Sequence, residues 1–160
     1  MKKLKRWQIP LFAFASFGPC MLSTIISVYL VDALQVAGFG ADVENWTFAA
    51  KTIIAVGLFS VLKAISSIMD GLVEVPVATL VQNLKPPWGK RRPAILVGTV
   101  VMTLAYILFC FPITLEENSV ANSIWFGVLL TVFVSFFTLA INALFGTYAE
   151  ITDTDNDRIT

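Results

Sequence analysis

Two acidic residues stand one helical turn apart inside an apolar stretch, and no other pair in the chain is better suited to chemistry. They are Asp70 and Glu74. Residues four apart on a helix point the same way, and carboxylates within an apolar helix are costly unless they have a use. This pair could supply oxygen ligands to a small cation or take up a proton. The alternative is a structural pair neutralised by Lys63 or by another basic side chain.

Lys63 shares the helical face of the two acids. At 100° per residue, Lys63, Asp70 and Glu74 fall within about 40° of one another. We expect so narrow a polar stripe to face a protein interior or a water-filled cavity. One hypothesis is that the Lys63 ammonium replaces a metal ion and pairs with Asp70 as an internal counter-ion. Otherwise Lys63 snorkels or belongs to an unrelated ion pair.

The composition is that of an integral membrane protein. Hydrophobic residues make up 57% of the chain and charged residues 14%, and the mean hydropathy is +0.79. Soluble domains carry about 25% charged residues, so a soluble bundle is excluded. There is no histidine, and Cys20 and Cys110 have no metal-site or disulfide-framework spacing. No nucleophile–base pair, phosphate loop or metal cluster occurs, so we expect neither an enzyme nor a nucleic-acid partner.

The elements that must position the acids are membrane helices. Four apolar stretches are long enough to span a bilayer. We therefore expect an all-α membrane protein with four transmembrane helices and a polar tail over residues 149–160. The predicted helices cover residues 9–34, 48–82, 94–113 and 121–148.

Small polar residues recur at spacings of three and four in the first and last of these helices. The first carries Ser16, Cys20, Ser23 and Ser27, and the last carries Thr131, Ser135, Thr138 and Asn142. Such stripes either line a cavity or let helices approach closely. The third predicted helix has almost no polar residues, which indicates a peripheral, lipid-facing position.

The loops after the first and third predicted helices contain no lysine or arginine, whereas clusters of basic residues occur at the alternate helix ends. They precede the first helix (Lys2, Lys3, Lys5 and Arg6) and separate the second from the third (Lys85, Lys90, Arg91 and Arg92). The positive-inside rule then places both chain ends in the cytoplasm. We expect a multi-pass protein of the plasma (inner) membrane.

The segment MDGLVEVPVATLVQNLKPPWGKRRPAILVG carries a specific pattern. An acid is followed four residues later by a second acid and then by Trp-Gly-basic-x-basic-Pro. The segment resembles the loop between helices 2 and 3 of the major facilitator superfamily. More narrowly, it is similar to the glycoside-pentoside-hexuronide:cation symporter family, of which melibiose permease is the familiar member. A weaker match covers residues 148–158, so the resemblance spans the chain.

The resemblance implies a twelve-helix transporter whose two halves rock around a midplane site. This chain then corresponds to an N-terminal fragment, and its partners would be membrane lipid, a small solute and the missing C-terminal part. The implied function is symport of a sugar or glycoside-like solute with Na⁺ or H⁺, and no cofactor.

The resemblance also implies roles for particular residues. Asp70, Glu74 and Thr138 would bind the cation. Facing the substrate cavity would be Cys20, Ser23, Ser27 and Asn142. The gating loop would include Trp88, Gly89, Lys90 and Arg92, with Arg158 beyond the last helix. Cys20 and Ile141 occupy the positions of the family's two sugar-binding carboxylates, which argues against an α-galactoside held by an acid pair.

Two other functions are compatible with the same residues. The chain could be a self-sufficient four-helix membrane protein that acts as an assembly or partner subunit. It could also be a relative of the family that carries a non-sugar solute, such as an amphipathic lipid.

Overall fold

The computed structural model describes residues 10, 14–30, 52–83 and 91–151. The elements are α2 (Phe17–Thr24), which continues as the π-helix η1 (Ile25–Leu30), and then α4 (Val56–Asn83), α5 (Arg92–Phe109) and α6 (Val120–Ile151). No strand occurs within these ranges. The expected all-α membrane fold is confirmed.

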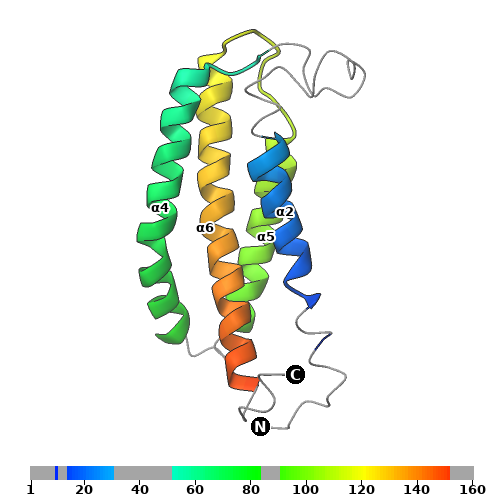
Figure 1. Ribbon diagram of the computed structural model, residues 1–160, viewed down its shortest axis with the longest axis vertical. Coiled ribbons are helices and arrows are strands. Elements are labelled where there is room, and N and C mark those ends of the chain that lie inside the picture. Colours follow the sequence, from blue (N-terminus) through cyan, green and yellow to red (C-terminus); the bar gives the residue numbers. More distant parts are fainter. Residues whose placement is uncertain (1–9, 11–13, 31–51, 84–90, 152–160) are drawn as a thin grey trace.

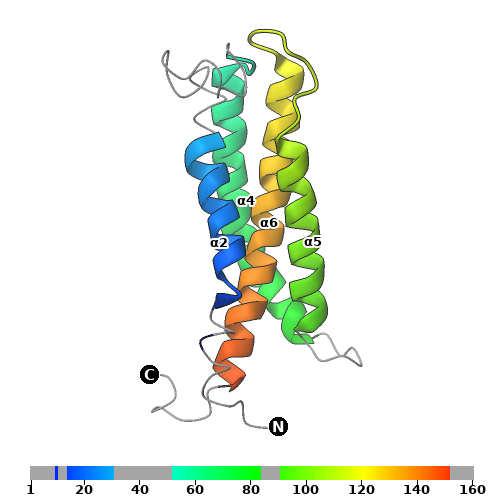
Figure 2. The same cartoon turned by 90° about the vertical axis from the view of Figure 1, so that its right-hand side faces the viewer.

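Helix α6 lies at the centre of the bundle. It packs against both α4 and α5 and also contacts α2. Figures 1 and 2 show that α4 and α6 run in the same direction, whereas α2 and α5 run in the opposite one. The two helices that carry Asp70 and Thr138 are therefore parallel neighbours.

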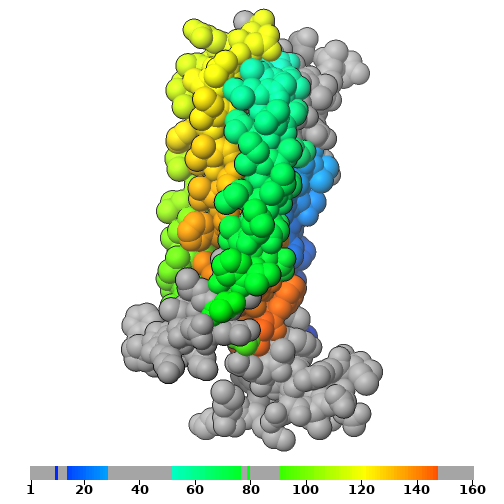
Figure 3. Space-filling model, turned by 90° about the vertical axis from the view of Figure 1, so that its left-hand side faces the viewer, coloured from blue at the N-terminus to red at the C-terminus, as the bar shows by residue number. Residues whose placement is uncertain are grey.

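Three of the described helices are long and apolar enough to cross a membrane. These spans are Val56–Pro76, Arg92–Phe109 and Val120–Thr147, and a shorter apolar helix covers Phe17–Val28. The predicted first helix, residues 9–34, extends at both ends beyond the described residues. Helix α4 lies on the face of the molecule that Figure 3 shows. Its exposed apolar side chains include Ile68, Leu72 and Val75, as expected of a lipid-facing surface.

Two predicted boundaries were wrong. Helix α4 begins at Val56 instead of residue 48, because residues 52–55 are not helical and are bonded to α6; residues 48–51 lie outside the described ranges. Helix α5 ends at Phe109 instead of residue 113, since Pro112 has no N–H with which to continue it. Helix α6 runs three residues past its predicted end at residue 148.

A buried asparagine joins three segments at one end of the bundle. Asn122 is 0% exposed. Its Oδ1 accepts hydrogen bonds from the backbone N–H groups of Ile113 and Thr114, both at 3.1 Å. Its Nδ2 donates to the carbonyls of Ile53 at 3.0 Å and Thr114 at 2.7 Å. All four hydrogen-bonding positions of the amide are therefore used.

Neighbouring bonds reinforce this junction. The Ser123 hydroxyl accepts a hydrogen bond from the Ala55 backbone N–H at 2.7 Å and donates to the Ser119 carbonyl at 2.9 Å. The backbone N–H of Asn118 donates to the Thr52 carbonyl at 3.0 Å. These bonds engage the backbone of residues 52–55 outside the helix, and α4 begins at Val56.

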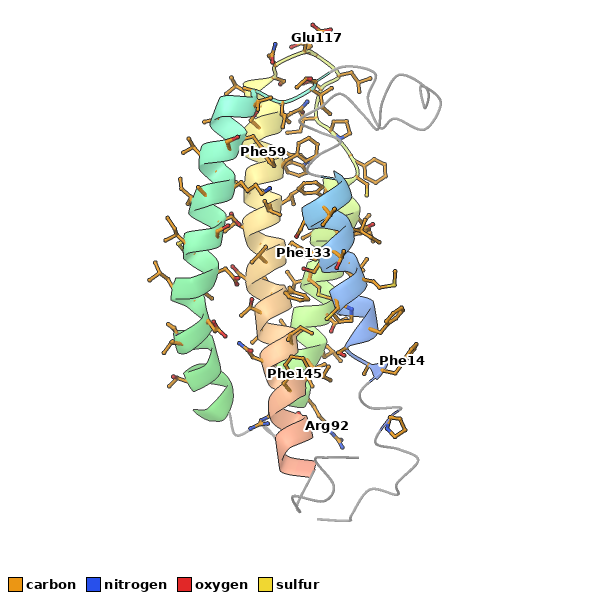
Figure 4. The ribbon with its side chains drawn as sticks, viewed as in Figure 1. Phe14, Phe59, Arg92, Glu117, Phe133 and Phe145 are labelled. Atoms are coloured by element: carbon orange, nitrogen blue, oxygen red, sulfur yellow. The ribbon has the colours of Figure 1, made fainter. Side chains whose placement is uncertain are left out.

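Below the junction, aromatic side chains fill the core. Phe59, Phe109, Phe126 and Phe133 are fully buried, and the rings of Phe109 and Phe126 lie 5.0 Å apart. Figure 4 shows Phe59 near the junction end of α4 and Phe133 near the middle of α6. The core is therefore most densely packed between the junction and the middle of the bundle.

Replacing Asn122 with alanine should destabilise the protein by about 2 kcal/mol or more, because the four backbone groups it serves would lose their partner. The midpoint of thermal unfolding in detergent measures this loss. Thr131→Ala is the matched control, since the Thr131 hydroxyl bonds only to the Gly127 carbonyl of its own helix. Equal stability of the two variants would contradict the role assigned to Asn122.

Replacing Gly98 with alanine should also destabilise the bundle, by about 1–3 kcal/mol, because overpacking shifts packed helices. A Cβ atom at Gly98 would lie 2.9 Å from both the Ala140 Cβ and the Phe136 carbonyl oxygen. At Gly57 nothing lies within 4 Å, so Gly57→Ala should be neutral or stabilising. Thermal unfolding of the two variants checks the difference, and a stabilising Gly98→Ala would show that α5 and α6 do not approach closely here.

Candidate functional site

The centre of the candidate site is a contact between α4 and α6. The Thr138 hydroxyl donates a hydrogen bond to Oδ1 of Asp70 at 2.6 Å. Both side chains are half-buried. The second carboxylate oxygen, Oδ2, accepts no hydrogen bond within the described residues. The contact thus presents a carboxylate and a hydroxyl oxygen side by side.

A cavity of about 240 Å³ opens beside this contact. Its polar lining comes from α2, η1 and α4, and its apolar lining comes from α6. The lining residues are Ser23, Ser27, Lys63, Ser66, Ser67, Asp70, Leu130, Val134 and Phe137. Its volume lies just below the range of about 300–1,000 Å³ that is usual for small-molecule sites. Helix α5 contributes none of these residues, as its lack of a polar stripe predicted.

Within this cavity, Ser66 is the polar residue with the least access to solvent. It is 3% exposed, and its Oγ forms no hydrogen bond in the described structure. The other α4 serine in the lining, Ser67, donates to the Lys63 carbonyl of its own helix at 3.1 Å. Buried hydroxyls are normally bonded, so Ser66 offers an unused polar group to whatever enters the cavity.

Lys63 and Asp70 line the same cavity without touching. No ion pair joins them in the part of the chain that the structure describes, and Asp70 bonds to Thr138 instead. Their separation of seven residues corresponds to about 10 Å along the helix axis. The hypothesis that Lys63 is the internal counter-ion of Asp70 stays a prediction.

The structure brings only some of the predicted residues to the cavity. Ser23 and Ser27 line it, whereas Cys20 is exposed and Asn142 is half-buried, and neither of these is among the lining residues. Glu74 lies one turn beyond Asp70 and is exposed. It could reach a cation held near Asp70 only from the edge of the site.

Most of the predicted gating loop cannot be placed. Trp88, Gly89, Lys90 and Arg158 lie outside the described residues. Arg92, at the start of α5, is exposed at the end of the bundle opposite Glu117, as Figure 4 shows. The gating role of these five residues stays a prediction.

Arg91, which the sequence reasoning did not single out, packs against α6. Its guanidinium lies over Gly146, where any side chain would overlap it. Gly146 is in the penultimate turn of α6, and a cation near a helix C-terminus is favourable. Of the basic residues between α4 and α5, Arg91 therefore contacts α6, while Arg92 faces solvent.

Two other residues were missed, and one of them had a recognisable signal. Ser66 stands three residues after Lys63 and four before Asp70, which is the spacing of a shared helical face. Asn122 carried no such signal, since a polar residue near a predicted helix start is common. Its role depends on the distant carbonyl of Ile53.

No group of three or more histidine, cysteine or acidic side chains gathers within the described part of the chain. The ligands of a cation at Asp70 would have to be hydroxyl and carboxylate oxygens. These are the ligands that hard cations such as Na⁺ prefer. Asp70 and Thr138 fit that requirement.

Helices long and apolar enough to span a bilayer, packed around a polar cavity, define a multi-pass membrane protein. Residues 9–160 match the family described as MFS/sugar transport protein, and the chain belongs to this family. The predicted membership in the sugar-transporting branch of the major facilitator superfamily is thereby confirmed.

One relative is a lactose permease from Lactobacillus helveticus. It is 26% identical over 149 residues, which cover 92% of this chain and 23% of the relative. The chain thus spans about a quarter of the length of the relative that it matches. No solved structure matches the chain.

A double-mutant cycle should reveal the Asp70–Thr138 contact. Thr138→Val and Asp70→Leu each remove one partner, and we expect a coupling energy of about 1–2 kcal/mol between them. Thr138→Ser keeps the hydroxyl and should retain most of the stability. Thermal unfolding in detergent measures all four variants, and strictly additive effects would mean that the two side chains do not interact.

Proposed function

We propose that this chain forms part of a cation-coupled symporter for a sugar or glycoside-like solute. The observation that carries the proposal is the Thr138–Asp70 hydrogen bond at the edge of a serine-lined cavity. The family description and the name of the relative support sugar as the solute class. The same findings favour transport over enzymatic catalysis.

In this proposal the two kinds of ligand bind next to one another. The cation, Na⁺ or H⁺, binds at Asp70 and Thr138, with Glu74 at the edge of the site. The solute occupies the cavity, where serine hydroxyls bond to its hydroxyl groups and the Leu130, Val134 and Phe137 wall packs against its apolar faces. Asp70 belongs to both sites, so each ligand can change the affinity for the other.

The proposed setting follows from charge and length. Basic residues at alternate helix ends favour the plasma (inner) membrane with both ends of the chain in the cytoplasm. Because the relative is about four times longer than the matched region, further helices would complete the cavity. In this proposal the exposed apolar face of α4 meets lipid or those helices.

Asp70→Asn should reduce cation-driven accumulation of the solute at least tenfold, because the amide cannot supply the negative charge that a cation needs. Uptake into membrane vesicles containing the complete product of the gene, with and without an imposed cation gradient, measures this. Glu117→Gln is the matched control, since Glu117 is an exposed acid in the loop at the far end of the bundle. Undiminished cation-driven accumulation by Asp70→Asn would refute the cation site.

A further inference from the structure

The connector between α5 and α6, residues 110–119, carries an apolar edge that the candidate site does not use. Its three exposed large apolar side chains are Phe111 (64% exposed), Ile113 (57%) and Leu115 (72%). The two residues between them are only half exposed. One of these, Thr114, turns inward, where its hydroxyl donates to the Ser119 hydroxyl at 3.1 Å. The connector therefore presents apolar side chains outward over residues 111–115.

This edge continues the exposed stripe of α5. The stripe includes Val100, Leu104 and Ile107, and Phe111 follows four residues later. Spacings of three and four lie on one helical face. The backbone N–H of Phe111 bonds to the Leu108 carbonyl at 3.0 Å, so Phe111 still belongs to the last turn. Helix α5 lines no part of the cavity and is apolar enough to span a bilayer, so this stripe is suited to contact with lipid.

The backbone of the edge is satisfied within the protein. Its four N–H groups are all bonded, two to the last turn of α5 and two to Oδ1 of Asn122. Pro112 has no N–H, so no N–H from residue 110 to residue 114 needs water. The Phe111 carbonyl accepts a hydrogen bond from the Trp125 indole at 3.1 Å. Irregular backbone is tolerated at membrane depth only where the protein supplies such partners.

Helix α5 is also short for a membrane span. Its 18 residues correspond to about 27 Å, whereas the hydrocarbon core of a bilayer is about 30 Å thick. Any tilt shortens the depth that the helix covers. Figure 2 shows that the connector rises past the end of α5 to reach the start of α6. The apolar edge therefore lies where the remaining hydrocarbon would be.

Acidic side chains mark the end of the apolar edge. Glu116 and Glu117 follow Leu115 directly and are exposed, and Figure 4 shows Glu117 at the tip of the connector. Carboxylates are costly in hydrocarbon, so Leu115 is the last residue suited to it. The connector has no basic residue with which to attract an anionic headgroup. The indole of Trp125 lies at the same level, and tryptophan is enriched at membrane interfaces.

We propose that residues 110–115 are embedded in the bilayer and complete the membrane crossing of α5. Their partner is the part of the phospholipid acyl chains that lies next to the headgroups. Asn122 and Trp125 allow this by bonding to the backbone of the edge, so that its side chains alone meet lipid. This contact does not depend on which solute or cation the protein carries.

Spin labels on single cysteines test the proposal in the complete product of the gene, in phosphatidylcholine nanodiscs and in a background without other cysteines. Collisions with oxygen, which concentrates in lipid, are compared with collisions with a water-soluble nickel chelate. Labels at Ile113→Cys and Leu115→Cys should give an oxygen-to-nickel ratio severalfold above that at Glu116→Cys. Leu104→Cys, on the exposed stripe of α5, is the control for a lipid-facing position. A ratio at Ile113→Cys equal to that at Glu116→Cys would place the connector in water and overturn the proposal.

Photolabelling of the wild-type protein needs no variant and provides a second test. A phosphatidylcholine with a diazirine near the headgroup end of its acyl chain should label residues 111–115 and leave residues 116–118 unlabelled. A diazirine at the end of the acyl chain should instead label the middle of α5, around Val100. Absence of label from residues 111–115, together with shielding of Ile113→Cys from both oxygen and nickel, would mean that protein covers the edge. That result would also overturn the proposal.

Discussion

Hydrogen bonds from Asn122 and Ser123, at the start of α6, to the segment that precedes α4 set the register between α4 and α6. Asn122 binds the Ile53 carbonyl and its neighbour Ser123 binds the Ala55 backbone N–H, across separations of 69 and 68 residues. Asp70 and Thr138 are also 68 residues apart. Because α4 and α6 are parallel, a constant separation means that the two helices stay in register from the junction to the site, over about 22 Å.

This constraint explains how a cavity can form around one carboxylate. Small residues such as Gly127, against which Leu62 packs, keep the two helices close, and the junction prevents them from sliding. Asp70 therefore meets a hydroxyl rather than an aliphatic side chain. Beside the contact between Asp70 and Thr138, α2 and η1 contribute Ser23 and Ser27 to the lining of the cavity. The site therefore depends on α4, on α6 and on α2 with its continuation η1. Helix α5 packs against α6 and does not line the cavity.

Much of this arrangement could be predicted from sequence, because it follows from helical periodicity and from the motif around Asp70. The helix class, the absence of α5 from the cavity lining, and the presence there of Lys63, Asp70, Ser23 and Ser27 all depend on local spacing. The start of α4 could not be predicted in this way, since it depends on hydrogen bonds from distant α6 side chains to the backbone of Ile53 and Ala55. Cys20 and Asn142, to which the resemblance gives a cavity role, are not among the residues that line the cavity. Arg91 contacts Gly146 through tertiary packing, which no local pattern encodes.

The central claim is that Asp70 couples a cation site to a neighbouring solute site. Its most direct test is the apparent affinity for solute, measured by equilibrium binding to the purified product of the complete gene at several Na⁺ concentrations and pH values. We predict that solute affinity rises as one of these two cations is added, and that solute raises the affinity for that cation by the same factor. Solute binding that is independent of both Na⁺ and pH would contradict the account.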